Sequence, residues 1–192
     1  MTNPNELTAV ERGEPARHPS MPTANEPERE RVWDPFIRIF HWGLAGAVLI
    51  AFLTEDDLQG LHTLAGYTVI GLIAARILWG VIGTHHARFT DFVCGPRATL
   101  AYLGDILRGH PARYLGHNPT GAAMAVALLG GLTATALTGV VALDHKWMEG
   151  IHEAIAYATL FLIPLHLLGV AIASLQHKEN LVRAMIDGYK RK

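Results

Sequence analysis

The key segment of the chain is residues 151–175, which read IHEAIAYATLFLIPLHLLGVAIASL. This run is apolar and about as long as a helix that crosses a bilayer. It carries two histidines, His152 and His166, fourteen positions apart. At about 100° and 1.5 Å per residue, fourteen steps return to within roughly 40° of the starting face and advance roughly 21 Å. One helix therefore presents two imidazoles on one face, one near each side of the membrane, as two metal centres in series require.

Three other segments have the same apolar character and length. Together the four predicted spans are roughly Pro35–Thr54, Leu61–Gly83, Gly121–Leu143 and Ile151–Leu175. Since the bilayer core offers no water to backbone groups, each span is expected to be a helix. The sequence therefore predicts an all-α integral membrane protein, a four-helix bundle whose helices run up-down-up-down.

The polar segments predict the domain organisation and the orientation. Residues 1–31 have no apolar core and no secretory-signal pattern, so we predict a disordered tail before a membrane domain over residues 32–192. Lysine and arginine concentrate in this tail, in the middle loop and in the C-terminal tail, whereas the two short connections carry a single lysine. The positive-inside rule then places both termini and the middle loop in the cytoplasm of a multi-pass protein of the bacterial inner membrane.

The chain has one cysteine, Cys94, in the middle loop. A single cysteine allows no disulfide framework, and the absence of a Cys-x-x-Cys-His motif excludes covalent c-type haem attachment. The sequence also contains no nucleic-acid-binding motif and no phosphate-binding glycine loop.

Four histidines lie within the predicted spans. His41 is near the cytoplasmic start of the first span and His62 at the outer start of the second. Matching depths pairs His62 with His152 on the outer side and His41 with His166 on the inner side. A lone histidine could be hydrogen-bonded inside the bundle or reach an interface, but four at two matched depths favour function, because ionisable groups in a bilayer are costly.

The ligand set favours haem over zinc. Zinc normally takes three or four protein ligands, and no Asp, Glu or Cys lies beside these histidines in the spans. Haem brings four equatorial nitrogens and needs only one or two axial ligands. We therefore predict two six-coordinate b haems with His41, His62, His152 and His166 as axial iron ligands, an arrangement suited to electron transfer.

The third span has small residues at every fourth position: Ala127, Gly131, Thr135 and Gly139. Such a stripe lets transmembrane helices approach closely, and it could also present a flat face to a macrocycle. Gly43 and Gly46, beside His41, allow the same two interpretations.

Arg76 is a cation within a span, fourteen residues after His62 and at the predicted depth of the inner site. A guanidinium there should have an anionic partner, and we expect a haem propionate or a group of a quinone site. The alternative is that Arg76 reaches the cytoplasmic interface.

Several motifs resemble one family. The chain is similar to prokaryotic cytochrome b561 and to the b-type cytochrome subunits of nickel-iron hydrogenases in VWDPFIRIFHW (32–42), LHTLAGY (61–67), RILWG (76–80), GHNP (116–119) and HKENLVR (177–183). The resemblance implies two b haems ligated from the first, second and fourth helices, at His41, His62, His152 and His166. Hydrogenase subunits typically have an additional helix, for which this chain has no span.

The resemblance further implies an electron carrier between the membrane quinone pool and a partner. Short acidic loops lie near the predicted outer haem, where we expect a periplasmic redox partner such as a cytochrome c to dock. We predict no catalytic residues in this respiratory electron carrier. Whether it also acts as a quinol-linked oxidoreductase stays open. Two alternatives remain, a quinone-dependent cytochrome that oxidises superoxide and a haem-free transporter or proton channel lined by histidines.

The other histidines of the membrane domain are predicted to lie in loops, where exposed polar residues are the default. His117 and His177 are the exceptions to consider, because a proton acceptor near the inner site would help quinol oxidation. Residues 99–108 and 181–186 have one apolar side each, and could form short helices on the cytoplasmic membrane face or pack on the bundle.

Overall fold

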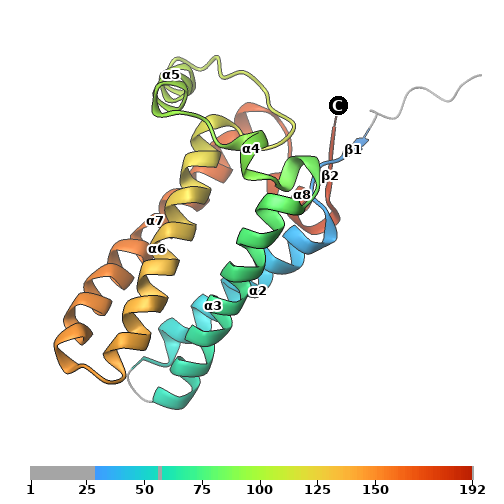
Figure 1. Ribbon diagram of the computed structural model, residues 1–192. Helices are drawn as coiled ribbons and strands as arrows, with labels where there is room; N and C mark the ends of the chain where they lie inside the picture. Colours follow the sequence, from blue (N-terminus) through green and yellow to red (C-terminus); the bar gives the residue numbers. More distant parts are fainter. Residues whose placement is uncertain (1–28, 56–57, 192) are drawn as a thin grey trace, which may run out of the picture.

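The computed structural model describes residues 29–55 and 58–191. Its four long helices are α2 (Pro35–Leu53), α3 (Gln59–Ile82), α6 (Pro119–Ala142) and α7 (Glu149–Gln176). They coincide with the four predicted spans, and all four are long and apolar enough to cross a membrane. The prediction of a helical membrane bundle is confirmed (Figure 1).

Two helix starts follow directly from the sequence. Asp34 precedes Pro35, and its side-chain oxygen accepts the backbone N–H of Ile37 at 2.9 Å. Asn118 caps α6 in the same way, accepting the N–H of Gly121 at 2.7 Å. A polar cap followed by proline satisfies an unpaired donor and presets the first helical φ, so both helices begin at defined residues.

The helices form two hairpins, α2 with α3 and α6 with α7, which are joined mainly where α3 packs against α6. By contrast, α7 makes little backbone contact with α2 or α3. Large apolar side chains point outward from the bundle, including Ile39, Val81 and Phe161 at 72%, 67% and 66% exposure. An outer surface of this kind suits lipid, because water would penalise so large an apolar area.

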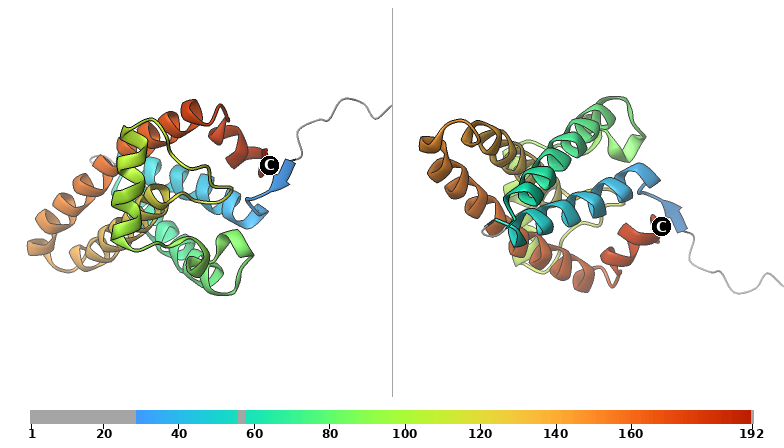
Figure 2. Two further views of the ribbon diagram at one scale, coloured as in Figure 1. Left: turned by 90° about the horizontal axis from the view of Figure 1, so that it is seen from above. Right: turned by 90° about the horizontal axis from the view of Figure 1, so that it is seen from below.

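Shorter elements gather at the ends of the bundle: η1 (His85–Ala87), α4 (Phe89–Phe92), α5 (Pro96–Leu107), η2 (Lys146–Met148) and α8 (Leu181–Asp187). The two amphipathic segments predicted at residues 99–108 and 181–186 are indeed helical, as α5 and α8. Seen from above, α5 lies across the end of the bundle (Figure 2). Leu100 and Leu107 on α5 are 67% and 80% exposed, so packing on the bundle does not cover them.

The two described ends of the chain pair with each other. Strand β1 (Arg29–Arg31) is antiparallel to β2 (Tyr189–Arg191). The predicted disordered tail was residues 1–31, and its last three residues are therefore a strand instead. No strand is predicted there from the sequence, because the segment is short and charged and its order comes from a partner strand about 160 residues away. Residues 1–28 lie outside the described part of the chain.

Gly188 makes this closure possible. Its φ is 89°, and its carbonyl accepts the N–H groups of Val32 and Trp33 at 3.0 and 3.1 Å. A Cβ at this position would lie 2.7 Å from the carbonyl oxygen of Trp33. Glycine is therefore required here both for the left-handed backbone and for the close approach of the two chain ends.

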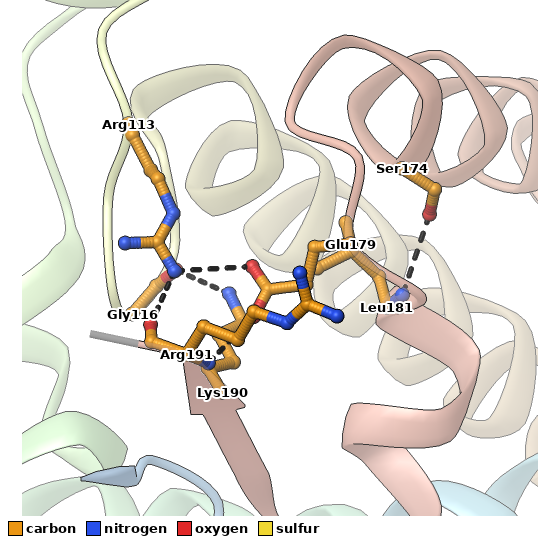
Figure 3. A network of polar contacts seen from close by, with 7 residues as sticks. All are labelled: Arg113, Gly116, Ser174, Glu179, Leu181, Lys190 and Arg191. Carbon is orange, nitrogen blue, oxygen red and sulfur yellow. Dashed lines mark hydrogen bonds and ion pairs between the residues drawn. The ribbon is translucent and has the colours of Figure 1, made fainter. Parts of the chain in front are cut away.

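A polar network fixes the C-terminal strand β2 to neighbouring segments at the same end of the bundle (Figure 3). Glu179 accepts the backbone N–H of Arg191 at 2.9 Å and forms an ion pair with Arg113 at 3.4 Å. Arg113 also donates to the carbonyl of Arg191. Lys190 donates to the carbonyl of Gly116 at 3.4 Å. The loop before α6, the end of α7 and β2 are thus connected.

Candidate functional site

The structure brings the four span histidines together as two pairs. The ring centroids of His62 and His152 are 6.1 Å apart, and those of His41 and His166 are 6.5 Å apart. We name them the outer pair and the inner pair after the predicted orientation. Each pair joins a helix of the first hairpin to α7.

These separations fit one metal ion between two imidazoles. An imidazole nitrogen lies about 2 Å from a bound metal, and the ring centre lies roughly 1 Å further back, so opposed rings on one ion have centroids about 6 Å apart. Both pairs are at this spacing, whereas imidazoles that hydrogen-bond or stack directly would lie closer. The geometry therefore accommodates a bis-histidine centre at each level.

The outer pair is oriented by backbone hydrogen bonds. Nδ1 of His62 lies 2.8 Å from the carbonyl of Ala51, and Nδ1 of His152 lies 2.9 Å from the carbonyl of Thr135. A carbonyl can only accept, so each Nδ1 carries the proton and each Nε2 keeps a free lone pair. Metal-ligating histidines are usually held in this way.

The inner pair differs in its surroundings. His41 is half-buried, and its Nδ1 is buried without a hydrogen-bond partner among the described residues. An edge-on contact with Trp42, at 5.0 Å between centroids, restricts the ring. A buried ring nitrogen without a partner is costly, and a ligand on the imidazole is the interaction that this site requires.

The small residues of α6 face α7. A Cβ on Gly131 would lie 2.7 Å from Oγ1 of Thr159, and one on Gly139 would lie 2.9 Å from Cε1 of His152. Close helix approach therefore explains Gly131, while Gly139 and Thr135 contact the imidazole of His152 directly. A role as a flat face for a macrocycle remains a prediction.

The two glycines beside His41, Gly43 and Gly46, both lie on α2 and differ from each other. A Cβ on Gly43 would lie 3.7 Å from Leu72, and Gly46 has nothing within 4 Å. Of these two glycines, only Gly43 lies at a contact between helices in the described chain.

Arg76 is buried, with 5% exposure, so it does not extend to an aqueous interface. Its guanidinium lies over the rings of Phe89 and Phe92, at 4.8 and 5.9 Å from their centroids. Its Nη1 has no hydrogen-bond partner in the described chain. The aromatic faces stabilise the cation, but one donor is left for an anion.

Other buried donors gather at the same end. We call Arg38, Arg76, His117 and Lys190 the basic cluster. Within the described residues, Arg38 Nε and His117 Nδ1 are, like Arg76 Nη1, buried without a partner. Burial lowers the pKa of Lys190, whose ammonium lies 5.5 Å from the ring centroid of Trp33. Several unsatisfied donors around an electropositive end suit a ligand with carboxylate groups.

The protein alone offers no conventional metal cage. In the described ranges, no group of three or more His, Cys, Asp or Glu residues could hold a metal ion. Two neutral imidazoles per level suit instead a group that supplies its own equatorial ligands, and the unsatisfied donors suit the carboxylates of haem.

Comparison with known proteins agrees with this chemistry. The profile of prokaryotic cytochrome b561 matches residues 32–188. The chain belongs to this family. Family membership implies haem b and a location in the membrane. The predicted resemblance is thus confirmed for the whole membrane domain.

A relative from Cupriavidus necator (strain H16) is named as a probable Ni/Fe-hydrogenase B-type cytochrome subunit. It is 24% identical over an alignment of 213 residues that covers 83% of this chain and 86% of the relative. No solved structure matches the chain significantly.

The sequence alone does not predict which residues pack around His117. Its ring packs against Phe92 and Trp33, at 4.5 and 4.8 Å between centroids. Burial, and then nearby cations, lower its pKa to about 3. The sequence singles out His117 as an exception among the loop histidines, and its packed ring confirms that it is not an exposed one. The default expectation of exposure holds for His85, His110 and His145, which are exposed, while His177 is half-buried.

Proposed function

We propose that this cytochrome carries electrons across the bacterial inner membrane through two b haems, one at the outer pair and one at the inner pair. The observation that supports this is the separation of 6.1 and 6.5 Å between the rings of the two pairs. Bound haem supplies a one-electron Fe(III)/Fe(II) couple. His62 with His152, and His41 with His166, would each hold one haem, and two imidazoles on each iron would favour electron transfer over oxygen binding.

The remaining residues adapt the site to its cofactor. The carbonyls of Ala51 and Thr135 hold the outer imidazoles in the ligating tautomer. Arg76, with a free buried donor, binds a propionate of the inner haem and neutralises its charge. The four apolar spans exclude water from both levels.

Both termini and the middle loop lie in the cytoplasm, following the positive-inside rule. A haem held by the inner pair would exchange electrons with quinol and quinone, and one held by the outer pair with a periplasmic redox protein such as a cytochrome c. The similarity to a protein named as a hydrogenase cytochrome subunit supports a redox enzyme as an equivalent partner class. The chain's role is respiratory electron transport.

The test is spectroscopic. Purified protein should have a reducible Soret band and a b-type α band, two haems per chain, and haem reduction on addition of a short-chain quinol. Protein that folds in membranes but binds no haem would refute the proposal and leave a histidine-lined transporter. Haem reduction by superoxide, with electrons leaving to quinone, would instead replace the periplasmic protein with superoxide as the donor.

A further inference from the structure

A groove opens at the inner end of the bundle, where α2 begins and α3 ends. Its volume is about 570 Å³, within the range typical of small-molecule sites. The walls that matter chemically are the side chains of Asp34, Phe36, Trp79, Thr84, His85 and His86. These residues come from the start of α2 and from the segment around the end of α3, just outside the apolar spans.

One wall of the groove is aromatic and rigid. The rings of Phe36 and Trp79 are stacked, with centroids 4.8 Å apart and planes at 29°. Asp34 Oδ2 accepts from Trp79 Nε1 at 3.1 Å and from Thr84 Oγ1 at 2.5 Å. Burial alone would raise the pKa of Asp34, but these hydrogen bonds and the helix-cap bond lower it overall, so the carboxylate stays ionised and holds the wall in place.

The other wall carries groups that can accept protons. His85 is exposed and His86 is half-buried, and their rings meet edge-on at 5.0 Å between centroids. In the described structure, no hydrogen bond engages either imidazole. The carboxylate of Asp34, by contrast, accepts from Trp79 and Thr84. Imidazole is the side chain best suited to proton exchange near neutral pH.

The groove is close to the inner pair. Asp34 precedes His41 by seven residues, which is about two turns or roughly 10 Å along α2. Trp79 follows the buried Arg76 by three residues, hence by about one turn of α3. The groove therefore lies just beyond the ends of the apolar spans α2 and α3, next to the level of the predicted inner haem.

We propose that this groove binds the ring of a quinol, with Phe36 and Trp79 against the ring and His85 and His86 accepting hydrogen bonds from its hydroxyl groups. This inference rests on the proposed function, and it assigns the substrate site. Oxidation breaks both O–H bonds of the quinol. The two protons would pass to His85 and His86 and then to water. A ferric haem held by the inner pair would take the two electrons one at a time, passing the first on to the outer centre before it accepts the second, and quinone would remain.

A second groove of about 580 Å³ lies at the same end, between the end of α7 and α8. Its lining includes Ala171, Ser174 and Lys178, and it has no aromatic ring and no imidazole. It serves as the internal comparison, because it offers similar size and depth without the stacking surface or the proton acceptors.

The decisive experiment is photolabelling of the haem-loaded protein in liposomes with an azido-substituted short-chain benzoquinone, followed by peptide mapping. The label is expected on residues 79–86 or 32–36. The double variant His85→Ala with His86→Ala, which removes both acceptors, should reduce labelling and raise the quinol concentration for half-maximal haem reduction by roughly 5- to 30-fold, as expected for two lost hydrogen bonds. Ala171→Phe, which fills the second groove at an exposed position, should change neither.

The possible results distinguish failure of the proposed quinol site from failure of the proposed electron-transfer function. Label on α7 and α8, or wild-type quinol dependence in the double variant, overturns the groove assignment while electron transfer from quinol stands. His85→Ala alone, at an exposed position, gives the same comparison if the double variant is unstable. Absence of both labelling and haem reduction in wild-type protein overturns the quinol site together with the quinone part of the proposed function.

Discussion

The substitution Gly139→Ala should weaken haem binding at the outer pair alone. The added Cβ would lie 2.9 Å from Cε1 and 3.2 Å from Nδ1 of His152. Ordinary carbon contacts are about 3.5–4 Å, so the imidazole must move by several tenths of an ångström. It cannot do so freely, because its Nδ1 donates to the carbonyl of Thr135 at 2.9 Å and its Nε2 must face His62.

Two effects set the magnitude. Overpacking a helix interface by one methyl group costs about 1–3 kcal/mol. Disturbing the hydrogen bond that orients a ligating histidine typically costs about 10- to 100-fold in affinity for the metal group. We therefore expect the outer haem to bind about 10- to 100-fold more weakly, while the inner haem, roughly 21 Å away along α7, keeps its affinity.

The assay is titration of apoprotein with haemin, followed by the Soret band and the reduced-minus-oxidised α band. Gly130→Ala is the matched control, since it lies on the same helix and a Cβ there has nothing within 4 Å. Alanine in place of glycine in a helix should by itself stabilise the protein by about 0.5–1 kcal/mol. Two equally tight haems in both variants, or loss of the inner haem in Gly139→Ala, would refute the assignment of His152 to an outer centre.

Four further substitutions test other parts of the site. His166→Ala should remove the inner haem and leave the outer one, and His62→Ala should do the reverse, as counted by pyridine haemochrome; loss of both haems from folded protein contradicts the pairing. In a redox titration, Arg76→Gln should lower the midpoint potential of one haem only, because a nearby cation favours the reduced form. The control Arg88→Gln, which removes a surface ion pair, should leave the midpoint potentials unchanged. The pKa of His117 is lowered from 6.5 to about 3, so the unfolded state binds more protons than the folded state between these values. The free energy of unfolding therefore falls by up to about 1.4 kcal/mol per pH unit as pH decreases below about 6.5. His117→Phe should reduce this loss, measured as the change in thermal midpoint between pH 7 and pH 5; an unchanged pH dependence counts against burial of the neutral ring.

The sequence predicts the features that depend on the bilayer. Apolar length alone locates four helices to within a few residues, because backbone groups in hydrocarbon have no alternative to helical hydrogen bonds. Helical geometry places His152 and His166 on one face, and the hairpin order determines which histidine meets each of them. The structure places His62 and His41 beside these two rings, and their role as iron ligands stays a prediction.

Features that arise from contacts between distant residues are not predictable in this way. Arg29–Arg31 becomes a strand only because Tyr189–Arg191 is beside it. His117 is buried by Trp33 and Phe92, which come from two other parts of the chain. The groove on α2 and α3 likewise depends on Asp34 reaching Trp79, 45 positions away. No local pattern encodes these pairings, since each involves polar or aromatic residues in segments without a clear periodicity.

The arrangement of the helices links cofactor binding to stability. Helix α7 packs along α6 but makes little backbone contact with α2 and α3, while each histidine pair connects α7 to one of these two helices. Iron held between the rings of a pair therefore joins the two hairpins at positions where the protein itself provides few contacts. A group that binds only the folded state stabilises it by about 4 kcal/mol when its free concentration is a thousand times its dissociation constant. Two such groups at different depths would hold α7 against tilting as well as separation, so the four imidazoles of the proposed electron path would also contribute to the assembly of the bundle.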